Sequence, residues 1–426
     1  MSSLVIKNGH VVDPSQNLNA VCDLKIENGT IIELGANLNG DEMLDATGLA
    51  VMPGLVDMHV HLRDPGFTYK EDILSGCMAA AAGGVTSLLC MPNTKPVVAS
   101  PETVRYIIEK AKDASAKVYP TASITKGLAG EVLTDFAALK AAGAIAVSDD
   151  GRPVENAAMM QKTLELAQKY GLLVTSHCED LKIIDGGIIN RGRISESLDV
   201  KGMDRSSEDS VTAREIALAA ATGTAVHIAH VSTKGSVALI RDAKARGVRI
   251  TAETAPHYFM LTDELLIKQD ADYRMNPPLR EKEDCDAVLN GLLDGTIDCI
   301  VTDHAPHSPE EKLDFKRAPN GVVGLETSFA ASVTALINTG KMTLSELVSK
   351  MSFNPATLLG IRAGSLHTGM PADIAIADLN EKWKVDVNHF RSKSRNSVFK
   401  GMTLTGRVKY TLLNGRIVYK EKGGAQ

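Results

Sequence analysis

The stretch Gly54-Leu55-Val56-Asp57-Met58-His59-Val60-His61-Leu62-Arg63 decides how this chain folds and where its chemistry lies. Alternate residues of a strand face the same side, so we expect His59 and His61 to point together, roughly 7 Å apart. Two neutral imidazoles in that arrangement can chelate one divalent ion. Arg63 continues the alternation and would place a guanidinium, which suits a substrate carboxylate, close to that ion. Taken alone, the pattern also fits two solvated polar residues at a strand end.

Metal-capable side chains recur at the ends of four further apolar runs. Each run reads as a buried strand: 144–147, 172–174, 225–229 and 297–301. They lead into Ser148-Asp149-Asp150-Gly151, Thr175-Ser176-His177-Cys178-Glu179-Asp180, His227-Ile228-Ala229-His230-Val231-Ser232 and Thr302-Asp303-His304-Ala305-Pro306-His307. A (β/α)₈ barrel builds its active site in this way, from the ends of several strands. The recurrence therefore favours a metal site over solvated charges.

The order of the expected elements predicts an α/β fold, a (β/α)₈ TIM barrel with a small β domain. Strands are expected near 54–61, 85–90, 117–122, 144–149, 172–177, 225–231, 248–253 and 298–303. Helical patterns lie between them at 71–82, 101–113, 131–142, 155–170, 208–222, 234–246 and 283–293. The flanks read as short strands with turns at Asn28-Gly29 and Asn414-Gly415. We expect residues 52–364 to form the barrel, and residues 1–51 and 365–426 to combine into the small domain.

Composition excludes several classes of protein. The 426 residues exceed the ~250 typical of a barrel, and 44% hydrophobic with 23% charged residues is ordinary for a soluble globular protein. A net charge of −6 gives no basic footprint for nucleic acid. The first residues lack a secretory pattern, and no apolar run is long enough to span a membrane. Six scattered cysteines read as buried thiols, so we expect a cytoplasmic protein, and Cys178 is expected in the core.

The candidate ligands divide into two sets. His59 and His61 would hold one ion with Asp303, and His177 and His230 would hold a second. Two ions ~3.5–4 Å apart need a shared anionic ligand. Asp150, beside the turn at Gly151, is favoured for that bridge, with Asp149 as the alternative because adjacent strand residues face opposite sides. Two other histidines are expected to serve the fold: His227 packed against a helix and His304 pointing away from the site.

Several motifs together resemble the dihydroorotases of the amidohydrolase superfamily, specifically the bacterial class I branch. They are Asp57-Met58-His59-Val60-His61-Leu62-Arg63-Asp64-Pro65-Gly66, Met91-Pro92-Asn93-Thr94, Met275-Asn276-Pro277-Pro278-Leu279-Arg280 and the run Gly295 to His307, with Lys312 beyond. The resemblance covers essentially the whole chain. Many members of the wider superfamily bridge their metals with a carbamylated lysine at the end of the fourth strand, where this chain has Asp150.

The resemblance implies reversible interconversion of N-carbamoyl-L-aspartate and L-dihydroorotate in pyrimidine synthesis. Two zinc ions per chain, bridged by Asp150, would activate water and polarise the ring amide carbonyl. Asp303 would take the water's proton and deliver it to the leaving nitrogen. The substrate contacts that the resemblance implies are His61, Arg63, Asn93, Asn276, His307, Asn320 and Gly321.

Two competing functions remain open at this stage. A hydantoinase or allantoinase would use similar chemistry, but its substrates lack the carboxylate that Arg63 and Asn93 would bind. An inactive structural partner of another pyrimidine enzyme would be expected to have lost metal ligands. We expect small-molecule substrates, a homodimer that can associate with another enzyme of the pathway, and neither nucleic acid nor membrane as a partner.

The segment from Pro306 to Gly324 is expected to form a long loop after the eighth strand. It is polar and shows no sustained periodicity, and loops of this length are usually functional or disordered. We expect it to close over substrate, with Lys312, Lys316 and Arg317 exposed to protease when the site is empty. A solvated loop without a role is the alternative.

Overall fold

Eight parallel strands form a ring in the computed structural model, which describes residues 3–421. Neighbours in the ring follow chain order, and a parallel bridge between Val60 and His304 joins the last strand segment to the first. The strands are β6 (Leu55–Val60), β7 (Val85–Cys90), β8 (Lys117–Ala122), β9 (Ala146–Val147), β10 (Leu173–Ser176), β13 (Val226–Ile228), β14 (Ile250–Thr254) and β15 (Cys299–Ile300). The predicted barrel is confirmed.

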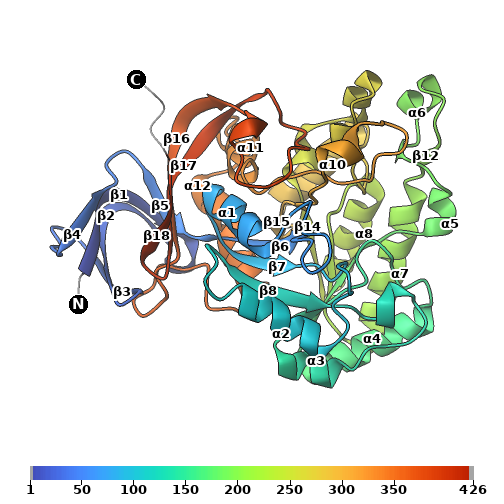
Figure 1. Ribbon diagram of the computed structural model, residues 1–426, viewed down its shortest axis with the longest axis horizontal. Helices are drawn as coiled ribbons and strands as arrows, with labels where there is room; N and C mark the ends of the chain where they lie inside the picture. The colour runs from blue at the N-terminus through green and yellow to red at the C-terminus, as the bar shows by residue number, and fades with distance from the viewer. Residues whose placement is uncertain (1–2, 422–426) are drawn as a thin grey trace.

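Helices cover the outside of this ring, as Figure 1 shows. They begin and end on ordinary capping signals: Asn156 caps the start of α4, and Gly171 ends it with a φ of 63°. The helices that follow successive strands are α1 (Ile73–Ala82), α2 (Pro101–Lys110), α3 (Phe136–Ala142), α4 (Ala157–Tyr170), α7 (Ser206–Thr222), α8 (Lys234–Ala245), α10 (Lys282–Leu293) and α11 (Ser328–Ser332).

Two apolar layers hold the barrel together. One lies between strands and helices and includes Leu88, Val174 and Ile228. The other fills the lower interior of the ring with Met58, Leu89, Met91, Ala146, Cys299 and Val301. Because these six residues come from β6, β7, β9 and β15 or the turns after them, they meet across the ring, as barrel interiors require. The interior is closed below by packed side chains, so the polar groups must gather at the carboxyl ends of the strands.

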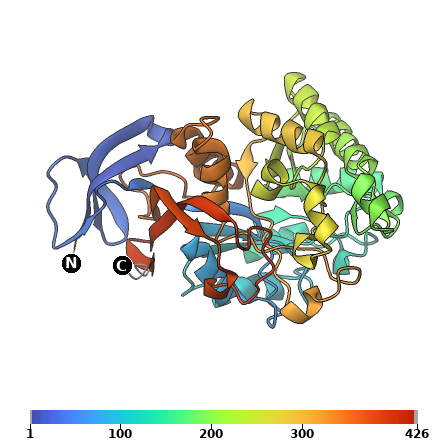
Figure 2. The ribbon, with the colours of Figure 1, turned by 90° about the horizontal axis from the view of Figure 1, so that it is seen from above.

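The two ends of the chain build one mixed sheet beside the barrel, seen at the left of Figures 1 and 2. Its order is β3-β2-β1-β5-β16-β17-β18, with β4 also paired to β1. The strands are β1 (Ser3–Asp13), β2 (Leu18–Glu27), β3 (Thr30–Gly35), β4 (Glu42–Asp45), β5 (Ala50–Pro53), β16 (Ile374–Lys384), β17 (Thr403–Leu413) and β18 (Arg416–Lys420). Both expected hairpin turns have left-handed residues, with φ of 53° at Asn28 and 47° at Asn414.

Some elements differ from the expectation. β9 and β15 contain two residues each, although their expected spans were six residues long. Residues between β10 and α7 form an excursion that the sequence did not predict, with α5 (Leu181–Ile184), β11 (Ile189–Asn190), α6 (Arg193–Ser197) and β12 (Gly202–Met203). The remaining helices are α9 (Pro256–Met260), α12 (Leu344–Val348) and α13 (Asn354–Leu359).

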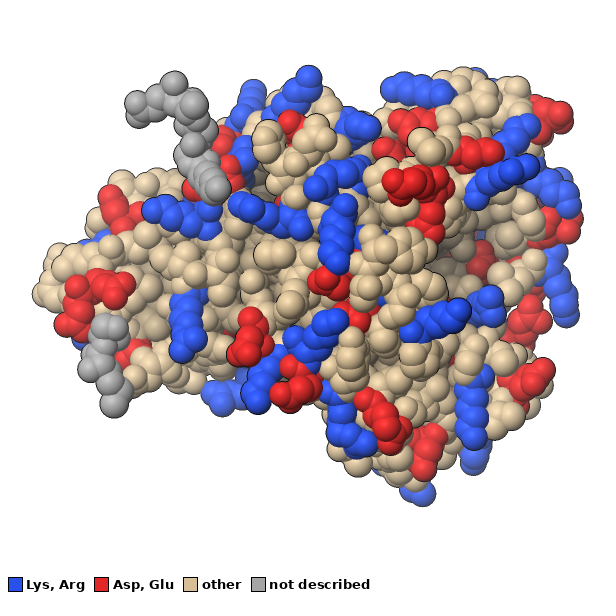
Figure 3. Space-filling model, viewed as in Figure 1, with Lys and Arg blue, Asp and Glu red and all other residues tan. Residues whose placement is uncertain are grey.

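The surface carries both signs of charge. On the face drawn in Figure 3, lysine and arginine side chains are interspersed with aspartate and glutamate. Within residues 3–421, no helix is both long enough and apolar enough to cross a membrane.

Candidate metal centre

Six buried side chains meet at the carboxyl-end mouth of the barrel. His59 comes from β6, and His61 from just beyond it; Asp150, His177, His230 and Asp303 follow β9, β10, β13 and β15. None is more than 6% exposed. They form two groups that could each hold a metal ion, and both include Asp150; these are His59, His61 and Asp150, and Asp150, His177 and His230.

The two histidines of the first group face two carboxylates, Asp150 and Asp303. His59 Nε2 is 3.3 Å from Asp150 Oδ1 and 3.8 Å from Asp303 Oδ1. His61 Nε2 is 3.5 Å from Asp150 Oδ2 and 3.1 Å from Asp303 Oδ1. Both imidazoles therefore present the same nitrogen to the same pair of acids. This arrangement brings Asp303 to the first pair, as the sequence predicted.

The second group shares Asp150 from the other side. His177 Nδ1 and His230 Nε2 are 2.8 Å apart, and they lie 3.5 and 3.8 Å from Asp150 Oδ1. Asp150 is therefore the one carboxylate common to both groups, which is the position a bridging ligand must occupy.

The donor set fits divalent cations. Among the described residues, Asp150 Oδ1 and His59 Nε2 are buried and have no hydrogen-bond partner. Leaving such atoms unsatisfied in an interior is costly, and native proteins rarely do so without a role. Imidazole nitrogens and carboxylate oxygens that converge on one buried point are the ligands that zinc and similar ions prefer.

The electrostatics also favour a cation at this point. Burial would raise the pKa of the Asp150 carboxyl, but His59, His177 and His230 outweigh burial and hold this pKa well below its ordinary range. For His177, burial alone would lower the imidazole pKa. Asp150 and Glu179 have the larger effect, and together they raise this pKa from its ordinary value to about 10. The carboxylates of Asp150 and Glu179 therefore stabilise positive charge on the ligand histidines or between them, and either protons or metal ions can provide that charge.

The choice between the two adjacent aspartates follows from their partners. Asp149 Oδ1 accepts hydrogen bonds from the backbone N–H groups of Ile124 and Thr125, at 2.7 and 3.1 Å. Its other oxygen accepts from the Thr125 hydroxyl. Asp149 is thereby occupied in fixing the loop after β8, whereas Asp150 faces the histidines.

Each of three histidines is held by a second buried or half-buried group. His59 Nδ1 is 2.7 Å from Glu253 Oε1, and His177 Nε2 is 3.1 Å from Glu179 Oε2. The Nδ1 atom of His61 lies 2.8 Å from Asn93 Oδ1. Such partners fix the tautomer of a ligand histidine and leave its other nitrogen free for a metal.

Sequence reasoning missed Glu253 and Glu179. Both are buried carboxylates at apolar strands, and acids are almost never fully buried without a partner. A glutamate within or directly after an apolar strand therefore indicates a buried carboxylate with a partner, and this signal could have identified both residues. Glu253 also binds His227 Nε2 at 3.0 Å, so His227 faces the barrel interior and the expectation that it packs against a helix is wrong. His304 does point away from the site, toward Glu71 at 3.4 Å.

Arg63 reaches the mouth from a turn and not from the strand. β6 ends at Val60, and Arg63 has a φ of 59°, so the expected alternation does not extend to it. Its Nε donates to Pro306 O at 3.1 Å, and its guanidinium lies 3.4 Å from His307 Nε2. Arg63, His230 and Asp303 all have positive φ, a conformation that costs of order 1–3 kcal/mol outside glycine and is typical of functional sites.

His307 is neutral and fully engaged. Burial, with Arg63, Lys70 and Lys312 nearby, lowers its pKa to about 2. Lys70 Nζ donates to Nδ1 at 3.2 Å, and Nε2–H then donates to Asn320 O at 2.9 Å. His307 is therefore oriented by cations on one side and a carbonyl on the other.

The other predicted substrate contacts lie near the ligands or in the loop after β15. Asn93 also donates to Asp150 Oδ2 at 3.3 Å, and Asn276 donates to Glu179 Oε1 at 2.9 Å. The N–H group of Gly321 donates to Arg274 O at 3.0 Å. A Cβ at Gly321, whose φ is 144°, would lie 2.6 Å from Ala305 O, so only glycine fits there.

The expectation that Lys312 is exposed is wrong. Its Nζ is half-buried beneath the loop and donates to Arg274 O, Pro319 O and Gly321 O at 3.0–3.2 Å. Lys316 and Arg317 are exposed as expected. Cys178 is buried in the core, as expected.

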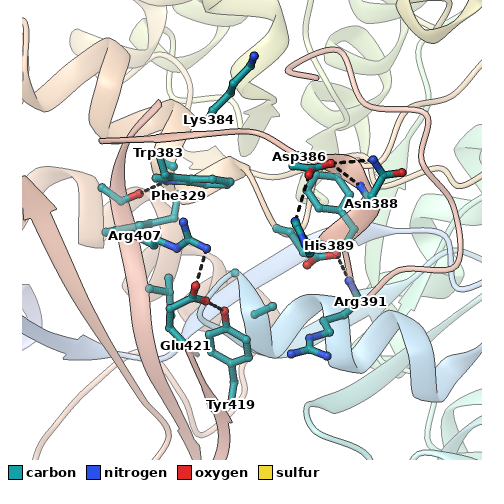
Figure 4. Close-up of a pocket in the computed structure, with 17 residues that line it drawn as sticks. Phe329, Trp383, Lys384, Asp386, Asn388, His389, Arg391, Arg407, Tyr419 and Glu421 are labelled. Atoms are coloured by element: carbon teal, nitrogen blue, oxygen red, sulfur yellow. Dashed lines mark hydrogen bonds and ion pairs between the residues drawn. The ribbon is translucent and has the colours of Figure 1, made fainter. Parts of the chain in front are cut away.

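A cavity of about 630 Å³ lies away from this centre, between the terminal sheet and the barrel (Figure 4). Phe329, Trp383 and Tyr419 line it together with Arg407 and Glu421. None of the predicted site residues borders it.

This chain is similar in sequence to dihydroorotases and in fold to a hydantoinase. A family model described as dihydro-orotase-like matches residues 48–236. The dihydroorotase of Acetivibrio thermocellus is 51% identical over 98% of this chain and 99% of its own length. That of Geobacter metallireducens is also 51% identical, over 98% of this chain and all of its own. Among solved structures, the L-hydantoinase (dihydropyrimidinase) of Arthrobacter aurescens superposes with a TM-score of 0.89 at 25% identity, covering 99% of this chain and 96% of that one.

Proposed function

We propose that this chain, which belongs to the dihydroorotase family, interconverts N-carbamoyl-L-aspartate and L-dihydroorotate by metal-dependent hydrolysis and closure of a cyclic amide. The observation that carries the proposal is the pair of ligand groups sharing Asp150, with a cationic clamp, Arg63, within the same mouth. The hydantoinases share the barrel, so the assignment depends on what this site adds to it.

Two zinc ions per chain are proposed as the cofactor, the first held by His59, His61 and Asp303 and the second by His177 and His230, with Asp150 between them. Zinc bound there would supply Lewis acidity, which lowers the pKa of water and polarises a carbonyl. Glu253 and Glu179 support this assignment, since each turns a metal-facing nitrogen of its histidine toward Asp150.

Asp303 is proposed as the proton carrier. Burial would raise its pKa, but the hydrogen bond with His61 and the charges of nearby imidazoles lower it below the ordinary value, so the carboxylate is ionised at neutral pH, which is the form that can accept a proton. When the ring amide bond breaks, the leaving carbamoyl nitrogen must receive the proton that Asp303 has accepted. A carboxylate at the mouth can deliver the proton to that nitrogen. The same group takes the proton back during ring closure.

Arg63 is proposed to bind the substrate carboxylate, together with Asn93 and His307. Burial lowers its pKa to about 10, which still leaves the guanidinium charged at neutral pH. A charged fork in a desolvated site suits a carboxylate and gives no advantage to an uncharged ring. Asn276 and the Asn320–Gly321 backbone are proposed to line the ureide edge. Gly321 would have to exchange existing partners to do so.

The test compares two substrates on purified protein. We expect turnover of L-dihydroorotate, monitored through the loss of its ultraviolet absorbance, and little turnover of hydantoin. Arg63→Met should reduce kcat/KM for dihydroorotate by roughly ten- to hundredfold, the effect of one charge-assisted contact. Preference for hydantoin in the unmodified protein would contradict the proposal and favour the hydantoinase alternative.

We propose three further properties: the compartment of the chain, its oligomeric state and its division into domains. The chain is proposed to act in the cytoplasm as a homodimer that can associate with another pyrimidine enzyme. We propose that it divides at residues 51/52 and 364/365 into a barrel and a composite β domain, although β5 (Ala50–Pro53) of the terminal sheet extends across the first of these boundaries. Sedimentation would measure the dimer.

A further inference from the structure

Residues 391–397, which we call the strap, come from the C-terminal part of the chain but lie on the barrel mouth. They follow β16, in the connection to β17. The strap holds the loop after β6: Ser394 Oγ donates to Lys70 O at 2.8 Å, and Lys393 Nζ donates to Thr68 O at 2.8 Å. It also holds the segment after β15, because the backbone N–H groups of Arg391 and Ser392 donate to Glu326 Oε1 at 2.8 and 3.1 Å.

One side chain of the strap ties the two ends of the loop after β15 together. Asn396 Oδ1 accepts from the backbone N–H of His307 at 3.2 Å. Its Nδ2 donates to Gly321 O at 2.9 Å and to Ala305 O at 3.3 Å. The backbone carbonyl of Asn396 accepts from Val323 N–H at 2.9 Å. Asn396 is 3% exposed, so these bonds do not compete with solvent.

Only a primary amide satisfies this set of partners. An N–H group on one side and two carbonyl oxygens on the other require an acceptor and two donor hydrogens in one planar group. Aspartate would turn an acceptor toward two carbonyls, and leucine would leave all three backbone groups without this partner. The partners also settle which end of the amide is oxygen.

We propose that Asn396 is a positioning residue for substrate binding: it fixes the segments that carry His307 and Gly321, and so sets the side of the mouth that holds the carboxylate contact of His307 and the ureide contact of Gly321. The inference rests on the proposed function of that side. Asn396 does not touch the metal ligands in the contacts above, so its removal should act on the loop and leave the metal centre in place. The substrate site of the barrel thereby depends on the C-terminal segment.

The experiment replaces Asn396 with leucine and measures metal content, kcat and KM for L-dihydroorotate, and hydrogen exchange over residues 305–323. We expect unchanged metal content, a KM raised roughly ten- to hundredfold, as loss of buried hydrogen bonds predicts, kcat changed far less, and faster exchange in the loop. Asn396→Asp should give the same pattern. Asn388→Leu is the matched control, because exposed Asn388 bonds only within its own turn, to Asp386.

Three results would overturn the inference. They are an unchanged KM with unchanged loop exchange, a fall in kcat as large as the rise in KM, and a loss of metal. The last two would make Asn396 a support of the fold or of the metal centre. Asn396→Ser provides the same comparison if the leucine variant does not fold. Failure of the proposed function is distinguishable, since the unmodified protein would then not turn over dihydroorotate while loop exchange would still respond.

Discussion

The metal centre and the loop after β15 meet at one mouth but are built differently. The ligands lie at strand ends, and buried acids behind them, such as Glu253, fix their orientation. The loop is held from within by Lys312 and from outside by Asn396, both of which donate to its carbonyl groups. We therefore expect substitutions in the metal centre to alter metal content, and substitutions that affect the loop after β15 to alter substrate binding.

The largest expected effect separates the two adjacent aspartates. Asp150→Ala removes the carboxylate common to both ligand groups, so most activity and at least one metal ion per chain should be lost while the fold persists. Asp149→Asn is the matched control: it should lower the melting temperature, because Asp149 fixes backbone N–H groups of the loop after β8, but keep the metal. Full activity and metal in Asp150→Ala would move the bridge to Asp149.

Asp303→Asn should come next in size. The amide keeps the shape and one coordinating oxygen but cannot carry a proton. General acid–base groups typically contribute 10²–10⁴-fold, and we expect kcat to fall by about that amount. Metal analysis on the same sample is the control. Near-normal turnover in both directions would refute the proton-carrying role.

Glu253→Gln tests whether the buried acid acts through the metal. Loss of such a partner typically costs 10–100-fold in metal affinity. We expect zinc affinity, measured by chelator competition, to fall within that range, and activity at saturating zinc to recover most of its original value. Activity lost at saturating zinc with unchanged affinity would place Glu253 outside the metal centre's support.

The smallest effect concerns Lys312, and it appears in stability. Burial, opposed in part by nearby Asp272, lowers its pKa from 10.5 to about 7. Between about pH 7 and 10.5 the unfolded chain therefore binds more protons at this group, so its contribution makes stability rise with pH. In urea unfolding, the stability of the unmodified protein relative to Lys312→Met should increase from about pH 6 to pH 9. A constant difference would contradict the shift.

The same contrast explains what the sequence could predict. Apolar runs alternating with helical patterns predicted the barrel, and the polar side chains at the ends of those runs predicted all six converging residues, because the carboxyl ends of barrel strands meet at one face. Arg63, His227 and Lys312 were misjudged. A left-handed turn places Arg63. The buried Glu253 of the neighbouring strand β14 binds His227, and loop carbonyl groups bind the Lys312 ammonium. Partners of that kind depend on tertiary contacts that spacing along the chain does not encode.

We propose that the shared-aspartate centre makes this chain a metal-dependent dihydroorotase. The most direct test of this proposal removes metal with a chelator and follows dihydroorotate hydrolysis while zinc is added back. We predict that activity disappears with the metal and returns as zinc approaches two ions per chain. Full turnover by metal-free protein would contradict the account.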